Sequence, residues 1–357
     1  MVNPIWALMN MCTHQNNRTL LWFLALCVAM HVNLAVHAQS TFRIIAYNVE
    51  NLFDCRNDSL TNDDVFLPNS MRAWTYARYQ HKLASISKVV AAIGEWDTPM
   101  LVGLCEVENE YCLKDLCKHG VLQSYGYDIV HYDSPDRRGI DVALLYNAQS
   151  FSLLTSEAIR VGDDLVEPFY TRDILYVKGI VGRIDTLHTF LCHFPSRWSG
   201  KRETEHLRMI AAAKVRQRVD SIMRDNAHAL IMVMGDFNDA PSDKCMAQTL
   251  NALPMDSVVQ EHRLYNLMWH HSRMKDTHYY QGQWNCFDQI VVSGALLKGN
   301  QRLQVKESGA QVFKPDFLLI DDEKYLQRRP WRTYNGMKYW GGFSDHLPIY
   351  VDLEIKE

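Results

Sequence analysis

The sequence lacks an excess of basic residues. Lys and Arg number 37 against 41 Asp and Glu, which gives a formal net charge of −4 at pH 7. Proteins that coat nucleic acids bind them through a broad positive field, and this composition argues against that class. Any polyanionic substrate must therefore meet a local cluster of groups and a metal ion.

The sequence also lacks a regular cysteine framework. Seven of its nine cysteines follow residue 38, and none forms a C-x-x-C pair. An odd number of irregularly spaced cysteines argues against a fold held by disulfides and against a structural zinc site. These cysteines are Cys55, Cys105, Cys112, Cys117, Cys192, Cys245 and Cys286.

No linker, internal repeat or low-complexity stretch divides the chain, so we expect a single domain over residues 39–357. Residues 1–38 are predicted to be a cleaved signal peptide. Arg18 is their only charged residue, and the apolar run 20–30 is followed by the small-residue site Val36-His37-Ala38. A membrane anchor is the alternative, but a span needs about 20 apolar residues. The sequence predicts a secreted or periplasmic protein without stable membrane insertion or an obligate protein partner.

The apolar pattern predicts a mixed α/β fold. Apolar residues at spacings of three and four indicate helices over 76–93 and 201–224, and the polar stretch 54–72 is interpreted as a surface loop. Short runs rich in β-branched and aromatic residues predict strands at Phe42–Tyr47, Met100–Cys105, Tyr127–His131, Val142–Tyr146, Ile174–Ile180, Thr189–Cys192, Leu230–Met234, Phe287–Val292 and Leu347–Leu353.

Polar residues with catalytic chemistry stand at the ends of these predicted strands, where they can converge on one rim of a sheet. Taken singly, each has an ordinary structural explanation: a turn, a strand cap or a buried histidine with its hydrogen bonds satisfied. The residues are Asn48, Glu106, His193, Asp236, Asn238, Asp288, Asp345 and His346.

Together these positions form an ordered set of motifs. The motifs are YNVEN (47–51), LCEVEN (104–109), RGIDVALLY (138–146), CHFPSR (192–197), GDFND (235–239), FDQI (287–290) and SDHLP (344–348). This set resembles the endonuclease/exonuclease/phosphatase superfamily, which includes deoxyribonuclease I. The segments 74–75 (WT), 171–175 (TRDIL), 195–197 (PSR) and 314–317 (KPDF) look closest to its secreted, nuclease-like Bacteroides-type branch. The resemblance implies a four-layer α/β sandwich, in which two packed mixed sheets are flanked by helices.

The resemblance also implies roles for the matched residues. His193 matches the residue that hydrogen-bonds the phosphate or leaving group, and Asp236 with Asn238 matches the pair that orients water and a phosphate oxygen. His346 matches the second histidine, with Asp288 as its carboxylate partner. Either Asp236 or His346 then takes the proton of the attacking water.

A divalent metal is expected beside these groups. Glu106, with Asn48 and Asp345, offers hard oxygen ligands that suit Mg²⁺ or Mn²⁺ better than zinc. Three arginines are candidate phosphate contacts, because a guanidinium can bind phosphate bidentately; ion pairing on the surface explains them equally well. These are Arg138, Arg172 and Arg197. Trp74, Trp198 and Trp340 are either stacking faces for a base or packing residues.

Three functions fit this sequence. The first is a secreted metal-dependent nuclease that hydrolyses DNA or RNA with an activated water. The second is a phosphatase or phosphodiesterase acting on inositol phosphates, phospholipid head groups or nucleotides, because residues 284–288 partly resemble an inositol-polyphosphate phosphatase motif. That motif continues with a basic residue, where this chain has Gln289. The third is a non-catalytic binding module, which the complete set of matched residues disfavours.

Overall fold

The computed structural model describes residues 41–162, 168–255, 258–271 and 276–356, which belong to one compact unit. The predicted signal peptide, residues 1–38, lies outside the described residues. None of the helices in the described part of the chain is both long and apolar enough to pass through a bilayer.

The first sheet, here the β1 sheet, has the strand order β14-β20-β1-β2-β4-β3, with β15 paired to β20. The pairing of β1 with β2 is parallel, whereas β1 with β20 and β2 with β4 are antiparallel, so the sheet is mixed. Its strands are β1 (Thr41–Leu52), β2 (Leu101–Val107), β3 (Asp128–His131), β4 (Asp141–Tyr146), β14 (Leu303–Val305), β15 (Gln311–Val312) and β20 (Ile349–Ile355).

The second sheet, here the β8 sheet, has the order β5-β6-β7-β8-β13-β10-β9. It is also mixed, because β7 pairs with β8 in parallel and β13 pairs with β8 antiparallel. Its strands are β5 (Phe151–Ile159), β6 (Ile174–Val181), β7 (Asp185–His193), β8 (Leu230–Asp236), β9 (Ala252–Leu253), β10 (Leu264–Asn266) and β13 (Asp288–Ser293).

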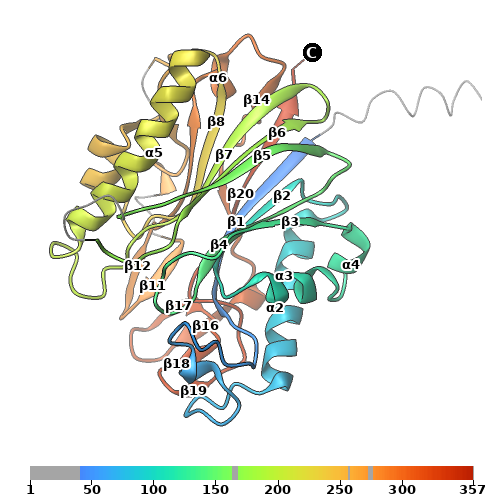
Figure 1. Cartoon of the computed structure of the whole chain (residues 1–357), viewed down its shortest axis with the longest axis vertical. Helices are drawn as coiled ribbons and strands as arrows, with labels where there is room; N and C mark the ends of the chain where they lie inside the picture. Colours follow the sequence, from blue (N-terminus) through green and yellow to red (C-terminus); the bar gives the residue numbers. More distant parts are fainter. Residues whose placement is uncertain (1–40, 163–167, 256–257, 272–275, 357) are drawn as a thin grey trace, which may run out of the picture. The chain divides into compact units, whose positions relative to one another are not determined.

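Helices cover the outer faces of the two sheets, as Figure 1 shows for α2 and α3 on one side and α5 on the other. The helices are η1 (Asp64–Phe66), α2 (Tyr76–Gly94), α3 (Glu110–Cys117), α4 (Leu122–Tyr125), α5 (Glu205–Asp225), η2 (Cys245–Thr249), α6 (Ala295–Lys298) and η4 (Asp316–Leu318). Three small hairpins complete the described fold: β11 (His278–Tyr280) with β12 (Gln283–Asn285), β16 (Leu319–Asp322) with β17 (Gln327–Pro330), and β18 (Tyr334–Asn335) with β19 (Lys338–Tyr339).

Alternate residues of the central strands face different layers, because successive side chains of a strand point to opposite faces. Ile44 of β1 packs between the sheets, and Ile45 packs with the apolar residues of α2. Met232 of β8 likewise faces the β1 sheet, whereas Val233 packs with α5. Burial on both faces explains the continuous apolar runs. The predicted four-layer sandwich is confirmed.

The nine predicted strands and two predicted helices are confirmed, with shifts of a few residues at their ends. The interpretation of residues 54–72 as a surface loop was only partly correct. Phe66 in this stretch is buried and stacks on Phe53 at 4.1 Å between ring centroids, and it meets Trp74 edge-on. A single aromatic residue in a polar stretch lacks the periodicity that would predict this packing.

The turn between β2 and α3 leads to a first prediction, concerning a helix cap. Asn109 precedes α3, and its side-chain oxygen accepts a hydrogen bond from the Cys112 amide at 2.9 Å. This bond satisfies one of the free amides of the first helical turn, so we expect Asn109→Ala to lower the free energy of unfolding by about 1 kcal/mol. Urea denaturation would measure the change, and Asn109→Asp should retain most of the stability.

Glu108 gives a second prediction, because it is a buried carboxyl group without a cationic partner in its hydrogen bonds. Its Oε2 accepts a hydrogen bond from the Asp54 amide at 2.7 Å. Burial raises the pKa of Glu108 from 4.5 to about 8. The folded state therefore holds a proton that the unfolded state releases, and stability falls as the pH rises from about 4.5 through 8.

A glutamine at position 108 removes this proton linkage. We expect Glu108→Gln to unfold nearly like the wild type near pH 5 and to be more stable by roughly 4 kcal/mol at pH 8.5. Urea unfolding at the two pH values measures the difference. An equal change at both values would show that the carboxyl group does not titrate as described.

Candidate active site

The predicted site residues lie at ends of strands that pair with one another. His193 ends β7 in register with Asp236, which ends β8, and Asp288 begins β13 opposite Asp236. Asn48 of β1 reaches across from the other sheet, and its Nδ2 donates a hydrogen bond to Asp236 Oδ2 at 3.0 Å. The two sheets therefore contribute to one cluster of polar side chains.

The backbone is irregular where this cluster forms. The β1–β2 register shifts after Asn48, and Glu106 adopts a left-handed conformation with φ of 67°. Gly235 has φ of 130°, and a Cβ atom there would lie 2.0 Å from the carbonyl oxygen of Cys192. Bulges and strained residues of this kind re-aim side chains at the ends of strands.

Asp236 is the centre of the cluster. Its Oδ1 accepts a hydrogen bond from the Asn238 amide at 2.9 Å, and its Oδ2 lies 3.6 Å from His193 Nε2 and 3.7 Å from His346 Nε2. Burial raises the pKa of Asp236, and the nearby His346 opposes that shift. A carboxylate between two imidazoles can orient a water molecule and accept its proton.

The two histidines have opposite charge preferences. Burial lowers the pKa of His193 well below its ordinary value, and the positive charges of Arg172 and Arg138 lower it further. Burial also opposes a charge on His346, but Asp288, whose Oδ2 lies 2.8 Å from His346 Nδ1, and Asp236 raise its pKa well above the ordinary range. One neutral and one charged imidazole therefore flank the same carboxylate.

Glu106 is placed to hold a metal ion. Its Oε1 accepts a hydrogen bond from Asn48 Nδ2 at 3.2 Å and its Oε2 accepts one from the Asn51 amide at 3.0 Å, so each oxygen keeps a further lone pair. Several other acidic groups lie in the same cluster. They are Glu50, Asp236, Asp288 and Asp345, and the cations nearest to them are Lys82, Arg332 and the protonated His346. A set of carboxylate oxygen donors fits a hard divalent cation such as Mg²⁺ or Mn²⁺.

The other two predicted ligands are placed differently. The Oδ1 of Asn48 accepts the Glu50 amide at 3.0 Å, and its NH₂ group faces the carboxylates of Glu106 and Asp236. Asn48 thus presents a donor to the centre, where the sequence had suggested an oxygen ligand. Asp345 forms an ion pair with Arg332 at 2.8 Å, which helps to hold its pKa at about 2 against the effect of burial.

The sequence missed Lys82 and Arg332. The Arg332 guanidinium bridges Glu50 and Asp345, with both N–O distances at 2.8 Å. Lys82 is buried in α2 and donates to the Phe343 carbonyl at 2.6 Å, and burial lowers its pKa to about 8. A lysine on the apolar face of the predicted helix was an available signal, because buried lysines are rare. Arg332 lies in a stretch without periodicity and gave none.

The three predicted phosphate-binding arginines differ in accessibility. Arg172 is buried, pairs with Asp136 at 3.0 Å and donates to the Phe194 carbonyl at 2.6 Å. Arg197 is held by Asp239 and Asp243 at 2.6 and 2.7 Å. Arg138 has a side chain that is 48% exposed and only a 3.5 Å ion pair. Arg138 is therefore the arginine freest to reach a substrate.

The family-model comparison matches residues 43–355 of this chain to the endonuclease/exonuclease/phosphatase family. The chain belongs to this family. The match covers every strand and helix that builds the cluster, and the prediction of a metal-dependent phosphoric ester hydrolase is confirmed at that level. No curated protein matches the chain.

Solved structures share the fold of this family member. D. rerio TDP2, humanized by 14 mutations, matches with 16% identity and a TM-score of 0.51 over 88% of this chain and 99% of that chain. The human nocturnin catalytic domain with bound sulfate matches with 14% identity and a TM-score of 0.52, over 88% and 95%.

An endonuclease/exonuclease/phosphatase family protein from Bacteroides thetaiotaomicron matches with 14% identity and a TM-score of 0.53, over 89% and 98%. Identities this low establish the shared fold alone. The assignment to a secreted Bacteroides-type branch stays a prediction.

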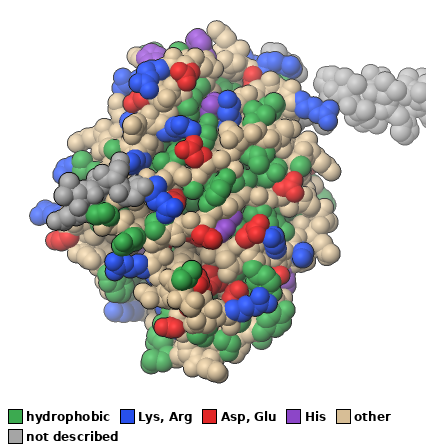
Figure 2. All heavy atoms as spheres, viewed as in Figure 1, with side chains coloured by type: hydrophobic (Ala, Val, Ile, Leu, Met, Phe, Trp, Pro, Cys, Tyr) green, Lys and Arg blue, Asp and Glu red, His purple; other side chains and the backbone are tan. Residues whose placement is uncertain are grey.

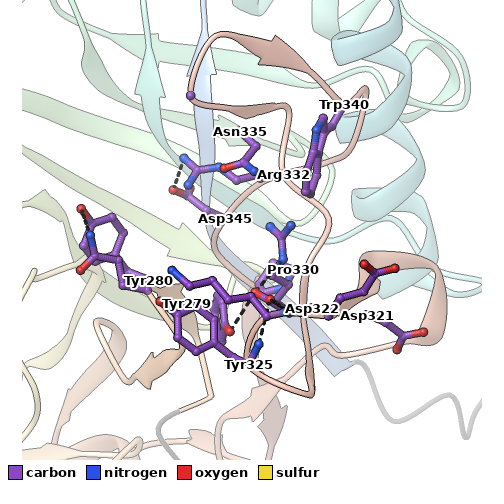
Figure 3. A pocket seen from close by; sticks show the side chains of 15 residues that line it. Tyr279, Tyr280, Asp321, Asp322, Tyr325, Pro330, Arg332, Asn335, Trp340 and Asp345 are labelled. Carbon is purple, nitrogen blue, oxygen red and sulfur yellow. Dashed lines mark hydrogen bonds and ion pairs between the residues drawn. The ribbon is translucent and has the colours of Figure 1, made fainter.

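A large hollow opens beside the cluster of this family member. It has a volume of about 780 Å³ and extends from Asp345 and Arg332 along the β11–β12 and β16–β17 hairpins (Figure 3). Tyr325 and Trp340 are among the residues that line it. The guanidinium of Arg329 covers the Trp340 ring at 4.3 Å. Of the other tryptophans, Trp74 is fully buried, whereas Trp198 is 92% exposed. Of the three tryptophans named from the sequence, Trp198 thus offers an exposed ring face, Trp340 a partly covered one and Trp74 none.

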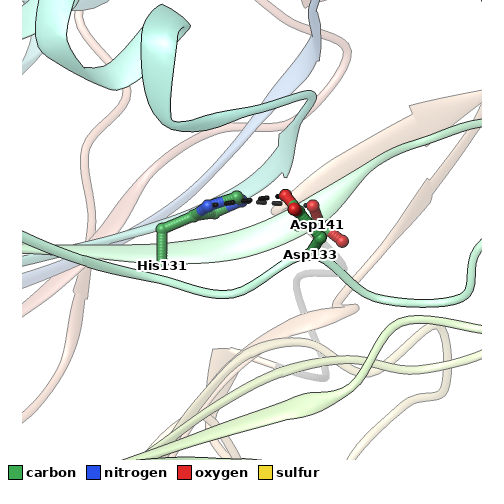
Figure 4. Close-up of side chains that lie close together, drawn as sticks. All are labelled: His131, Asp133 and Asp141. Carbon is green, nitrogen blue, oxygen red and sulfur yellow. Dashed lines mark hydrogen bonds and ion pairs between the residues drawn. The ribbon is translucent and has the colours of Figure 1, made fainter. Parts of the chain in front are cut away.

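A second group of possible metal ligands lies at the start of β4. Ligand atoms of His131, Asp133 and Asp141 lie within 4.8 Å of one another (Figure 4). The two oxygens of Asp141 already accept bonds, from His131 Nε2 at 3.1 Å and from the Ser134 amide at 2.9 Å. Because of these bonds, we interpret the group of His131, Asp133 and Asp141 as an anchor for the loop that carries Arg138. Mg²⁺ commonly binds through one or two carboxylates and retains water, so Glu106 remains the better candidate.

Proposed function

We propose that this chain is an exported nuclease that hydrolyses phosphodiester bonds of DNA or RNA with an activated water. The observation that carries the proposal is the Asp236 carboxylate, whose Oδ2 lies 3.6 Å from His193 and 3.7 Å from His346. In this proposal residues 1–38 direct export, and residues 39–357 form one catalytic domain.

The charge states of the two histidines suggest their roles. A neutral His193 can donate a hydrogen bond to a phosphate oxygen or the leaving oxygen. A protonated His346, held by Asp288, stabilises negative charge that develops during the reaction. Because His346 already carries a proton, Asp236 is the group that accepts the proton of water, and Asn238 orients the phosphate.

Glu106 is proposed to hold Mg²⁺ or Mn²⁺, which when bound neutralises charge on the phosphate. Asn48 orients the Glu106 and Asp236 carboxylates through its NH₂ group. Asp345, fixed by Arg332, is a second acidic group for the ion or its water shell. Arg138 is proposed as a phosphate contact, while Arg172 and Arg197 hold the surrounding loops through their ion pairs.

Nucleic acid as the substrate is supported by relatives of the fold and by the surface. A structure of D. rerio TDP2 in complex with a single-strand DNA product matches this chain with 16% identity and a TM-score of 0.51. Basic and acidic side chains are interspersed on the face drawn in Figure 2. Such a surface favours short or single-stranded substrates over long duplexes, which need many phosphate contacts.

The surroundings of Gln289 do not support the inositol-phosphate alternative. Gln289, which replaces the basic residue of that motif, is buried, and its Nε2 donates to the Asp239 carbonyl at 2.5 Å. Its Oε1 accepts a bond from Asn266 Nδ2 at 2.6 Å. Gln289 therefore packs below the site and offers nothing to a second phosphate.

A substrate panel tests the proposal. Purified protein would be incubated with supercoiled DNA, RNA, inositol phosphates and bis-p-nitrophenyl phosphate, with Mg²⁺ or Mn²⁺ and with chelator. We expect chelator-sensitive cleavage of nucleic acid that is lost in His193→Ala. Turnover of inositol phosphates or small esters alone would favour the phosphatase alternative, and inactivity with every substrate would favour a binding module.

A further inference from the structure

Arg72, which the sequence did not single out, is a cation without an acidic partner. Its guanidinium is held between two aromatic rings, with Cζ 4.8 Å from the centroid of Phe66 and 5.3 Å from that of Tyr334. Among the described residues no carboxylate forms an ion pair with it. Its Nε is buried without a hydrogen-bond partner, but the side chain as a whole is only partly buried and its two terminal nitrogens remain accessible.

Packing between the two rings does not by itself explain an arginine at position 72. Burial lowers the pKa of Arg72 and the positive charge of Arg332 adds to this effect, although Tyr334 and Glu50 oppose it. A methionine would fill the space between the rings without the cost of a partly buried, unpaired charge. A charge left unpaired in this way favours an anion from outside the chain.

Arg72 lines a cavity of about 250 Å³ that adjoins Glu106. Asn51 lies in the same lining, and its amide donates a hydrogen bond to Glu106 Oε2 at 3.0 Å. Trp198, which is 92% exposed, lines the cavity as well. The cavity therefore joins an unpaired cation and an exposed ring to the carboxylate proposed to hold the metal ion.

The other charged groups of this cavity offset each other. Glu50 is the one carboxylate among its described lining residues, and both of its oxygens are engaged. Arg332 pairs with Oε1 at 2.8 Å, and the Thr333 amide donates to Oε2 at 2.7 Å. Arg72 thus leaves the lining with a net positive charge.

We propose that Arg72 binds a second phosphate of the substrate, the one that neighbours the scissile phosphodiester in a nucleic acid strand. The inference rests on the proposed function, because it places the scissile phosphate beside Glu106 and Asp236. A guanidinium can bind a phosphate through two parallel hydrogen bonds. An exposed ring such as Trp198 beside a cation is the combination that binds single strands, in which a base stacks and the backbone pairs with the charge. Arg72 would thus select polynucleotides over isolated phosphodiesters.

Calorimetry on the purified full chain with Mg²⁺ tests this binding without requiring turnover. It would compare thymidine 3′-monophosphate, thymidine 5′-monophosphate and thymidine 3′,5′-bisphosphate, whose two phosphates are one nucleoside apart. We expect the bisphosphate to bind the wild type at least about tenfold more tightly than the better of the two monophosphates. Arg72→Met, which keeps the packing between the rings, should reduce this ratio to about twofold or less, and Arg72→Lys should restore part of it.

Arg56→Met is the matched control. Arg56 lies on the same polar stretch, and its guanidinium covers the Tyr111 ring at 4.4 Å, outside this cavity, so its loss should leave the ratio unchanged. The proposal is refuted if the wild type does not prefer the bisphosphate, if no ligand binds, if Arg72→Met keeps the preference, or if Arg56→Met loses it equally. A preference found only with myo-inositol 1,4-bisphosphate would overturn the assignment to nucleic acid. Hydrolysis of supercoiled DNA and RNA, measured in parallel, reports on the proposed function separately.

Discussion

The substitution Asp236→Asn is expected to reduce the turnover number by about a thousandfold or more while the protein remains folded. Asp236 Oδ2 lies between the two histidines and receives the Asn48 amide at 3.0 Å. Asparagine keeps the shape of the side chain and its bond to the Asn238 amide, but it removes the negative charge and the proton-accepting oxygen. Steady-state kinetics on bis-p-nitrophenyl phosphate, with circular dichroism to check folding, measure the effect.

The control is the same substitution at another buried aspartate. Asp352 on β20 pairs with Arg43 at 2.8 Å, and Arg43 precedes Asn48 by five residues along β1. Asp352→Asn should lower stability, because it weakens the ion pair of the partly buried Arg43 guanidinium, and change the turnover number by no more than about twofold. If the two variants lose activity equally, loss of a buried charge and not loss of the proton acceptor explains the result at Asp236.

Glu106→Gln is expected to raise the Mg²⁺ concentration needed for half-maximal activity by about a hundredfold. An amide has the size of the carboxylate but lacks the charge that a hard cation requires. Binding can be followed without activity, because free Mn²⁺ gives an electron paramagnetic resonance signal that disappears on binding. We expect the high-affinity binding of one ion to be lost in the variant.

Glu110 provides the matched control for Glu106. It lies on α3, four residues further along the chain, with a side chain that is 56% exposed and paired to Lys114 at 2.6 Å. Glu110→Gln should leave both the metal dependence and Mn²⁺ binding unchanged. Retention of tight Mn²⁺ binding by Glu106→Gln would contradict the assignment and direct attention to His131, Asp133 and Asp141.

The central strands were predictable from sequence because they are buried on both faces. All seven residues of β8 are buried, which produces the continuous apolar run that indicated a strand. β5 forms one edge of its sheet, and its irregular burial leaves neither an apolar run nor a clean alternation, so it was missed. The three small hairpins were missed because their pairing depends on turns and long-range contacts.

The site was predictable in composition but not in detail. In the sequence, the acids and histidines come directly after apolar runs. Once these runs are identified as strands, the side chains are expected to meet at one rim of the sheet. The orientation of the Asn48 amide depends on the Glu50 backbone, and the burial of Arg172 depends on Asp136, which is 36 residues away. The contact between His278 and His346 joins residues that lie even further apart along the chain. Such contacts leave no local pattern in a single sequence.

If Glu106 and the acids around it hold a divalent cation as proposed, ion occupancy is also linked to the thermodynamics of folding. The unfolded chain disperses these acids, so the cation would bind the native state far better than the denatured state. Stability then grows with the logarithm of the cation concentration, by about 2.7 kcal/mol at a hundred times the dissociation constant. If the chain is also exported as proposed, it would be most resistant to unfolding and proteolysis in surroundings rich in divalent cations.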